Sequence, residues 1–402
     1  MISFDFRKYN GGYVKKDDKI KYLDKAREIK ARFVNGDLSY INKLDSYIPK
    51  KDLIKLINIT DYIKENCDVF LVIGIGGSYM GSKAVIEALS PKYEIRKPEV
   101  IFLGNNLCSE EYKEVFDYIE NKEIIVNVIS KSGSTIETTS AFSLVMEMMK
   151  KKYDEEKLKN RIIVTTDPED GYLRNLANEK DYVSFDIPKN IGGRFSYLTP
   201  VGLLPIAASG INILYLIEGA KKSFDMVDRA IEYAVFRDIM YQKGKIVEAF
   251  TVYNPKLYYF TEWLKQIFAE TQGKSGKGIL PISVVNTRDL HSLGQFLQNG
   301  NHIIFETIID ITKDVKVSLD KYDMELNSLN KIVMDKVAMA HMKGDTPSNL
   351  ITIDEKTEIT IGELMHFFLL SAIVGALIMD VNPFDQPGVE KYKELVKKEL
   401  EC

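Results

Sequence analysis

Short apolar runs alternate with amphipathic segments along most of the chain, and this alternation constrains the fold more than any other feature of the sequence. In the first half, the runs have the length and composition of buried strands; they span residues 68–73, 99–103, 123–129, 161–165 and 182–187. Strands that alternate with helices pair in parallel through right-handed crossovers. The first half is therefore predicted to form a doubly wound α/β domain that closes near Gly210.

The second half is built in the same way. After a helical stretch, strand-like runs again alternate with helical patterns; the predicted strands span residues 247–253, 279–285, 303–311 and 350–353. The predicted fold class is α/β, with two doubly wound domains whose parallel sheets are flanked by helices. The predicted organisation is an N-terminal helical segment at 1–66, a first α/β domain at 67–210, a second at 211–380 and a C-terminal helical segment at 381–402.

The charge and the apolar content restrict the partners of the chain. Its 402 residues carry a formal net charge of −4, which gives no reason to expect nucleic acid or an anionic membrane as a partner. The most apolar stretch, Leu364–Met379, is short for a membrane span and contains His366, so we expect a buried core helix there. The first residues lack the pattern of a signal peptide. We therefore expect no membrane association and a cytoplasmic location.

The cysteines and histidines are not spaced like the ligands of a metal site. Cys67, Cys108 and Cys402 show no CxxC spacing and cannot form an even set of disulfides, which is typical of a reducing compartment. The four histidines are scattered without an HxxxH pair. We expect no metal and no cofactor.

A loop rich in hydroxyl groups is the first candidate for ligand binding. The predicted strand at 123–129 leads through Ser130-Lys-Ser-Gly-Ser-Thr135 into a predicted helix at 141–149. A helix N-terminus presents free N–H groups and the positive end of a dipole to an anion, and hydroxyl groups can donate to phosphate oxygens. The segment indicates a phosphate site, although Ser and Thr also favour ordinary N-caps and turns.

A glycine-rich turn follows the first predicted strand. Gly74-Ile-Gly-Gly-Ser-Tyr-Met-Gly81 misses the dinucleotide motif, because Tyr79 stands at the third glycine position, and it misses the P-loop, because Ser82-Lys83 reverses the required order. Glycines nevertheless let a ligand approach the backbone, and Ser78 could donate to it. We expect ligand binding here, with a purely structural turn as the alternative.

Two further segments carry side chains that suit acid–base chemistry. Arg194 follows two glycines that could turn its guanidinium toward a cleft, where it could stabilise an oxyanion; the alternative is an ion-paired arginine in a surface loop. Glu270 lies at the end of a predicted helix, one turn after Gln266, where the helix dipole disfavours a carboxylate. The alternative is a solvated glutamate. By themselves, His291 and Lys393 would be assigned structural or solvated roles.

Together these segments resemble the phosphoglucose isomerase family, whose members have paired sugar-isomerase domains. The resemblance extends from about Cys67 to Lys393 and rests on motifs that occur in the family's order: Gly-Ile-Gly-Gly-Ser78, Ser130-Lys-Ser132, Gly-Gly-Arg194-Phe-Ser196, Gln266…Glu270-Thr-Gln-Gly-Lys274 and Asp385-Gln-Pro-Gly-Val-Glu-Lys-Tyr-Lys393. It implies two flavodoxin-like, sugar-isomerase-type domains.

The resemblance also implies roles for individual residues. Glu270 matches the base that moves the proton between sugar C1 and C2, and Arg194 matches the residue that stabilises the enediolate. His291 and Lys393 match the pair associated with ring opening, while Pro387 stands where larger members have Trp. The residues that match contacts to the substrate or its phosphate are Gly77, Ser78, Ser130, Lys131, Ser132, Thr135, Thr138, Gln266 and Gln386.

The implied activity is the interconversion of glucose 6-phosphate and fructose 6-phosphate through an enediol(ate), in glycolysis and gluconeogenesis. The resemblance further implies a homodimer in which His291 would act across subunits. An isomerase of broader specificity that includes mannose 6-phosphate would keep the same catalytic residues. A non-catalytic sugar-phosphate sensor would keep the phosphate loops without needing Glu270 or Arg194. Both alternatives remain open at this stage.

Overall fold

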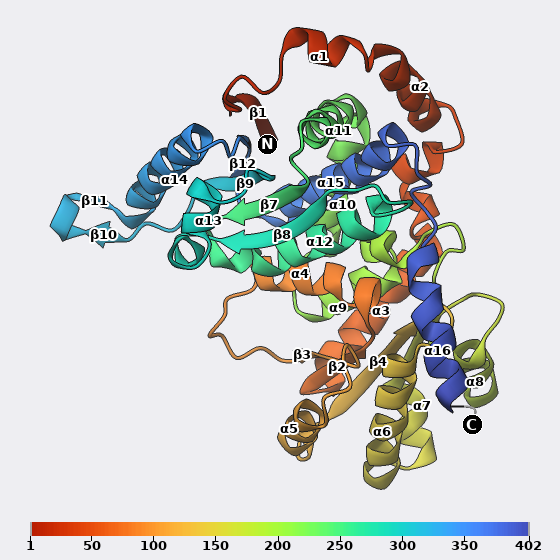
Figure 1. The fold of residues 1–402 in the computed structure, drawn as a ribbon. Coiled ribbons are helices and arrows are strands. Elements are labelled where there is room, and N and C mark those ends of the chain that lie inside the picture. The colour runs from red at the N-terminus through yellow and green to blue at the C-terminus, as the bar shows by residue number, and fades with distance from the viewer. Residues whose placement is uncertain (1, 401–402) are drawn as a thin grey trace. The chain divides into compact units, whose positions relative to one another are not determined.

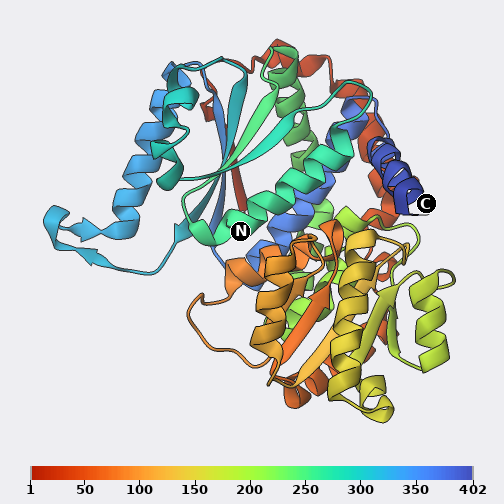
Figure 2. The same ribbon diagram turned by 60° about the horizontal axis from the view of Figure 1, so that its bottom comes forward.

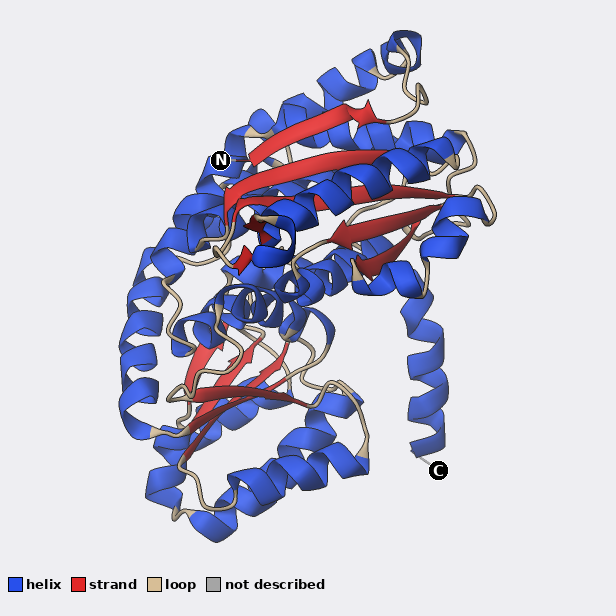
Figure 3. Cartoon of the chain, turned by 90° about the vertical axis from the view of Figure 1, so that its left-hand side faces the viewer, coloured by secondary structure: helices blue, strands red, loops and turns tan. Residues whose placement is uncertain are grey.

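Figure 1 shows the computed structural model of the chain, which describes residues 2–400. The third cysteine, Cys402, lies outside these residues. The chain forms two compact units. We call Tyr40–Ile217 the first-sheet unit, and Met1–Ser39 together with Glu218–Cys402 the second-sheet unit. Among the described residues each unit contains one five-stranded sheet, and Figure 3 shows the strands of both sheets in red.

The sheet of the first-sheet unit is entirely parallel and has the strand order β3-β2-β4-β5-β6. Its strands are β2 (Val69–Ile73), β3 (Glu99–Leu103), β4 (Ile124–Ser130), β5 (Ile162–Thr166) and β6 (Val183–Asp186). Every residue of β2, β4 and β5 is buried, as expected for parallel strands that are covered on both faces. The order is that of the flavodoxin-like fold, so the predicted doubly wound domain is confirmed.

Helices cover this sheet, as Figure 2 shows. Apolar side chains of the strands, such as Leu71 and Val126, form one core cluster with helix residues such as Val145. The elements of the unit that carry or flank candidate site residues are η3 (Gly76–Ser78), α4 (Met80–Leu89), α6 (Ile136–Lys152) and η4 (Gly193–Leu198). The remaining helices of about two turns or more are α3 (Lys50–Asn66), α5 (Ser109–Ile119), α7 (Glu155–Arg161), α8 (Tyr172–Lys180) and α9 (Pro200–Ala208), while α10 (Ile213–Lys222) spans the boundary of the units.

The second sheet has the strand order β1-β12-β9-β7-β8. Its strands are β1 (Ile2–Tyr9), β7 (Val247–Val252), β8 (Leu280–Val285), β9 (Ile304–Lys313) and β12 (Ser348–Glu355). The strands β12, β9, β7 and β8 are parallel and wind as in the first sheet. The second predicted α/β domain is therefore also confirmed in its fold class.

The prediction of a helical segment at 1–66 is wrong at its start, because β1 is a strand that pairs antiparallel with β12, with Ile2 opposite Ile353. The buried apolar residues of β1 are Ile2, Phe6 and Tyr9. This spacing resembles that of a helix face, because a register shift between Asp5 and Tyr9 interrupts the alternation of buried and exposed side chains that a regular strand would show. The partner of this edge strand, β12, lies far away in the sequence, so the pairing cannot be recognised from local sequence patterns. As a result, residues 1–39 belong to the second-sheet unit and not to a separate segment.

The long helices of the second-sheet unit are α2 (Leu23–Val34), α11 (Val227–Gln242), α12 (Tyr258–Gln272), α14 (Leu326–Lys343), α15 (Glu358–Ile378) and α16 (Glu390–Leu400). By length and composition α15 could cross a membrane, but 89% of its apolar window is buried inside the structure, which agrees with the predicted core helix. The segment that carries His291 forms two short helices, η7 (Arg288–His291) and α13 (Gly294–Asn299). A short hairpin, β10 (Ser318–Leu319) and β11 (Met324–Glu325), precedes α14.

A fully buried polar network ties α11 and α12 to the second sheet. Arg237 on α11 donates to Glu248 on β7 over 2.7 Å and to Oε1 of Gln272, the last residue of α12, over 2.6 Å. Gln272 in turn donates to the carbonyl oxygen of Ala372 on α15 over 3.0 Å. Glu248 also accepts from Tyr233 over 2.6 Å. Because a buried charge must be paired and hydrogen-bonded, this network holds the last residue of α12 against α11 and α15.

Candidate functional site

The candidate phosphate groups of the first-sheet unit lie where an open α/β sheet is expected to bind ligands. In such sheets ligands bind outside the carboxyl ends of the strands, at the point where the strand order reverses. In the order β3-β2-β4-β5-β6 this point lies between β2 and β4. The turn that contains Ser78 follows β2, and the loop from Ser130 to Thr135 follows β4. The two motifs are therefore at the same edge of the sheet.

The loop after β4 is held in shape by its own hydroxyl groups. Ser130 is only 4% exposed, and its Oγ accepts a hydrogen bond from the backbone N–H of Gly133 over 3.1 Å. Gly133 has a φ of 66°, which glycine adopts without strain. The exposed Ser132 accepts from the N–H of Ser134 over 3.3 Å, and Thr135 is the N-cap of α6. The loop thus brings hydroxyl groups and the N-terminus of α6 together, as the phosphate prediction requires.

Lys131 and Thr138 have surroundings that the sequence did not predict. The ammonium group of Lys131 donates to the carbonyl oxygens of Lys189 over 2.9 Å and Ile191 over 3.2 Å, and burial lowers its pKa. This side chain therefore connects the loop to the segment that precedes Arg194. Thr138 is 1% exposed, and its Oγ1 has no hydrogen-bond partner among the described residues. Ser78 is half-buried at the end of η3.

The glycine-rich turn packs directly against the segment of Arg194. A Cβ atom on Gly77 would lie 2.2 Å from the carbonyl group of Gly193 and 2.6 Å from the backbone nitrogen of Arg194, so only glycine fits. Ser196 donates to the carbonyl oxygen of Gly193 over 2.6 Å and stabilises the turn. Arg194 is 3% exposed, so the alternative of a surface-loop arginine is wrong. Two motifs that are far apart in the sequence thus form one structure.

Glu270 is oriented by two side-chain amides in the second-sheet unit. It lies in the last turn of α12, where Gln266 donates to its Oε1 over 3.0 Å. Gln386, which precedes the short helix η9 (Pro387–Val389), donates to its Oε2. The helix ends at Gly273, where a Cβ atom would lie 2.7 Å from the carbonyl oxygen of Ala269. Each carboxylate oxygen therefore accepts a hydrogen bond from an amide, and the alternative of a merely solvated glutamate is wrong.

His291 and Lys393 are not brought to Glu270 by any hydrogen bond or ion pair among the described residues. His291 ends η7 and is exposed. Lys393 is 52% exposed on α16 and forms an ion pair of 2.9 Å with Glu390, one turn earlier on the same helix. Their roles in ring opening remain predictions from the resemblance.

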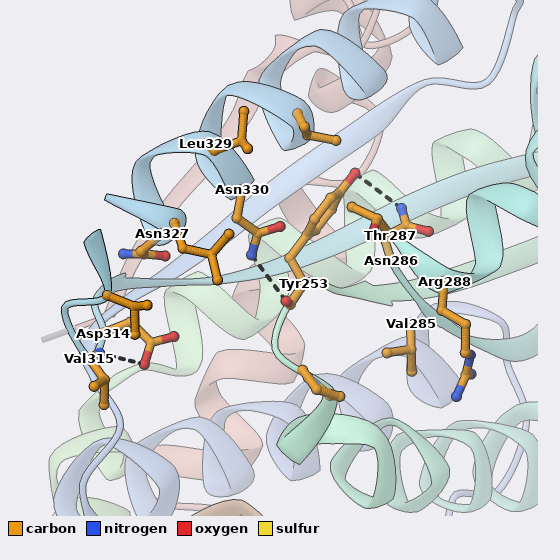
Figure 4. Close-up of a pocket in the computed structure, with 14 residues that line it drawn as sticks. Tyr253, Val285, Asn286, Thr287, Arg288, Asp314, Val315, Asn327, Leu329 and Asn330 are labelled. Carbon is orange, nitrogen blue, oxygen red and sulfur yellow. Dashed lines mark hydrogen bonds between the residues drawn. The ribbon is translucent and has the colours of Figure 1, made fainter. Parts of the chain in front are cut away.

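A separate pocket of about 630 Å³ lies at the carboxyl edge of the second sheet (Figure 4). Tyr253, which follows β7, accepts through its hydroxyl group from Asn286, which follows β8, over 3.1 Å. Asn330 on α14 donates to the carbonyl oxygen of Tyr253 over 3.2 Å. Apolar side chains such as Leu329 and Val285 complete the wall. None of the predicted site residues lines this pocket.

Sequence reasoning did not assign a role to two charged residues near Glu270. Lys274 and Asp385 occur in the quoted motifs, and they form an ion pair of 2.7 Å. Their opposite charges and their positions in two of the motifs could have suggested a role for them. The sequence does not show that the two residues form a pair.

The family model and the curated relatives agree on one family. A family model described as phosphoglucose isomerase matches residues 50–319 and 313–401. A glucose-6-phosphate isomerase of Caldanaerobacter subterraneus subsp. tengcongensis is 39% identical over 98% of this chain and 94% of its own length. A solved hypothetical protein of Thermus thermophilus is 25% identical, with a TM-score of 0.87 and 100% of both chains covered. A solved glucose-6-phosphate isomerase of Chlamydia trachomatis has a TM-score of 0.77 and 21% identity, over 88% of this chain and 73% of that one, and supports the fold.

Proposed function

The chain belongs to the phosphoglucose isomerase family, and from this premise we propose how its residues carry out the reaction. It catalyses the aldose–ketose interconversion of glucose 6-phosphate and fructose 6-phosphate. The observation that carries our assignment of the base is the geometry of Glu270. Two amide donors, Gln266 and Gln386, fix both of its carboxylate oxygens, and a proton acceptor in catalysis must be held in one orientation.

In the proposed mechanism Glu270 removes the proton from C2 of the open-chain aldose. The electron pair of the C2–H bond forms the C1–C2 double bond, and the carbonyl π electrons move to O1. The same carboxyl group then returns the proton to C1, while the proton of the C2 hydroxyl group is transferred to O1 as the new carbonyl group forms at C2. One base thus serves both steps without net gain or loss of a proton.

Arg194 is proposed to stabilise the negative charge that develops on the enediolate oxygens. A guanidinium stays charged and presents several donors in one plane, and a buried donor stabilises an oxyanion more strongly than one in water. The burial of Arg194 supports this role. The hydroxyl groups of Ser78, Ser132 and Thr135 are proposed to bind the 6-phosphate, because they lie at the edge where helix N-termini favour an anion. Phosphate binding far from the reacting carbons positions the sugar.

The test of the base is Glu270→Gln, which keeps the size and removes the proton acceptor. General-base catalysis contributes about 10²–10⁴-fold, so kcat should fall by roughly that factor while KM changes much less. Glu262→Gln, on the same helix and paired with Lys265, is the matched control and should retain activity. Wild-type enzyme should also exchange the C2 hydrogen of the substrate with solvent deuterium. A folded Glu270→Gln protein with near-normal kcat would refute the assignment.

The same assay separates the remaining alternatives. Membership of an isomerase family argues against the non-catalytic sugar-phosphate sensor, which would bind fructose 6-phosphate without turnover and would not exchange its hydrogen with solvent. Mannose 6-phosphate, assayed beside glucose 6-phosphate, decides whether the specificity at C2 is strict or broad.

We further propose that the enzyme is a homodimer in which His291 acts in the site of the partner subunit. Two observations support this proposal. His291 is exposed, and the apolar side chains that follow it, Leu293 and Phe296, are 37% and 45% exposed, as expected for a surface that another chain covers. Mixing inactive His291→Ala with inactive Glu270→Gln protein should restore partial activity. Verified mixed dimers without recovery would contradict the sharing.

A cytoplasmic location is also proposed. Cys67 and Cys108 are free thiols, as is usual in a reducing compartment.

A further inference from the structure

The end of α12 is fastened to the segment that carries Gln386. Lys274 follows the helix, and its ammonium group donates to the carbonyl oxygen of Asn382 and to Oδ1 of Asp385, the latter over 2.7 Å. The Lys274 side chain is only 7% exposed, whereas that of Asp385 is 50% exposed, so the ammonium group is the buried partner of the ion pair. The ammonium group holds the pKa of the Asp385 carboxyl below its ordinary value.

The residue next to Asp385 contacts the proposed base. Gln386 donates to Oε2 of Glu270, and Glu270 and Lys274 lie on either side of the helix end at Gly273. The contacts therefore form a closed ring: Glu270 leads along the chain to Lys274, Lys274 pairs with Asp385, and Gln386 returns to Glu270. The ring connects two of the sequence motifs through the ion pair of Lys274 with Asp385.

The segment around Gln386 lies at the surface of the second-sheet unit. The side chains from Phe384 to Gly388 are exposed, and a segment with few buried contacts opens at a low free energy. Before them, Lys277 donates to the carbonyl oxygen of Met379 over 2.8 Å. That bond fastens the start of the segment, several residues away from Gln386. The ion pair of Lys274, by contrast, reaches the residue next to Gln386 and involves a largely buried charge.

We propose that Lys274 is a positioning residue that, through Asp385, holds the amide of Gln386 against the carboxylate of Glu270. This inference rests on the proposed role of Glu270 as the base. Without Lys274 the amide of Gln386 leaves the carboxylate, the carboxyl group is less well oriented, and fewer substrate encounters have the reactive geometry. A misplacement of about 1 Å can cost about 10²-fold in rate, so the loss of one orienting bond, with that of Gln266 retained, should cost about 10-fold in kcat.

The test compares variants in steady-state kinetics. Lys274→Met should lower kcat about 10-fold and change KM less than about 2-fold, because the phosphate contacts are untouched. Lys274→Arg keeps the charge and should retain most of the wild-type kcat. The control Lys277→Met removes a neighbouring tether that does not reach Gln386, and it should leave kcat near the wild-type value. Circular dichroism and the melting temperature verify that each variant is folded.

A double-mutant cycle separates positioning from a general structural effect. If Lys274 acts through Gln386, adding Lys274→Met to Gln386→Ala should change kcat by less than about 2-fold, whereas independent effects would multiply. Multiplicative losses, an inactive Lys274→Arg, or an equal loss in Lys277→Met would each overturn the inference. Should Lys274→Met fail to fold, Asp385→Asn removes the same ion pair from the exposed side and enters the same cycle.

The outcome for Glu270→Gln distinguishes the two proposals. If that variant retains normal kcat, Glu270 is not the base, and Lys274 cannot act by positioning it. If it is inactive while the cycle is multiplicative, the base stands and only the role of Lys274 is refuted.

Discussion

Replacing His366 should change how the stability of the second-sheet unit depends on pH. His366 lies in α15, is fully buried, and has its ring centroid 4.7 Å from that of Phe224. Burial lowers its pKa from the ordinary 6.5 to about 3. The variant His366→Phe keeps a ring of similar size at this position and removes the titrating group.

The direction in which the unfolding free energy changes with pH depends on whether the folded or the unfolded state binds the proton. The folded state holds His366 neutral, whereas the unfolded chain protonates it below pH 6.5. Stability from this residue is therefore complete above pH 6.5 and is lost as the pH falls toward 3. One pKa unit corresponds to about 1.36 kcal/mol. The lowering from 6.5 to about 3 therefore corresponds to roughly 5 kcal/mol in total, and roughly 2 kcal/mol of it should be lost between about pH 6.5 and 4.5.

The measurement is urea unfolding of both proteins at several pH values, followed by the fluorescence of Trp263. This residue is the single tryptophan, is 1% exposed and lies in the same unit. The quantity of interest is the difference in unfolding free energy between the two proteins, because other titrating groups cancel in it. Cancellation matters here, since burial raises the pKa of the nearby Glu363, which opposes the effect of His366 in acid.

Relative to the wild type, His366→Phe should gain about 1.4 kcal/mol for each pH unit below about 6.5. Parallel pH curves for the wild type and His366→Phe would refute the reasoning.

Two further predictions concern the phosphate groups and the buried ion pair. Ser78→Ala with Thr135→Ala should raise KM for fructose 6-phosphate, with free phosphate as a competitive inhibitor of the wild type; unchanged KM without inhibition would exclude the site. Arg237→Met should lower the unfolding free energy by about 3–5 kcal/mol, because it leaves Glu248 charged and buried; adding Glu248→Gln should recover part of the loss, and a loss below about 1 kcal/mol would contradict the argument.

Much of the fold could be predicted from local patterns. The parallel strands were predicted nearly at their observed positions, because a fully buried strand is a continuous apolar run between turn residues. The core helix α15 was predicted because it is a long, strongly apolar run. β1 was missed, because its apolar spacing imitates a helix and its pairing partner, β12, lies at the other end of the chain.

The candidate site was predictable only in part. The motifs and the family could be identified from the sequence, because residue types at fixed spacings encode turns, helix ends and donors. Which side chains meet could not. Three contacts join residues that are far apart in the sequence: Gly77 with Gly193, the ion pair of Lys274 with Asp385, and the hydrogen bond from Gln386 to Glu270.

The sequence by itself determined the local elements of this protein, because hydrophobic period, glycine placement and helix ends depend on neighbouring residues. Only the tertiary structure decided the orientation of Glu270 and the burial of Arg194, because both depend on how distant elements pack. A carboxylate in the last turn of a helix could equally be solvated; it becomes a fixed base when Gln266 on its own helix and Gln386 on a distant segment both donate to it.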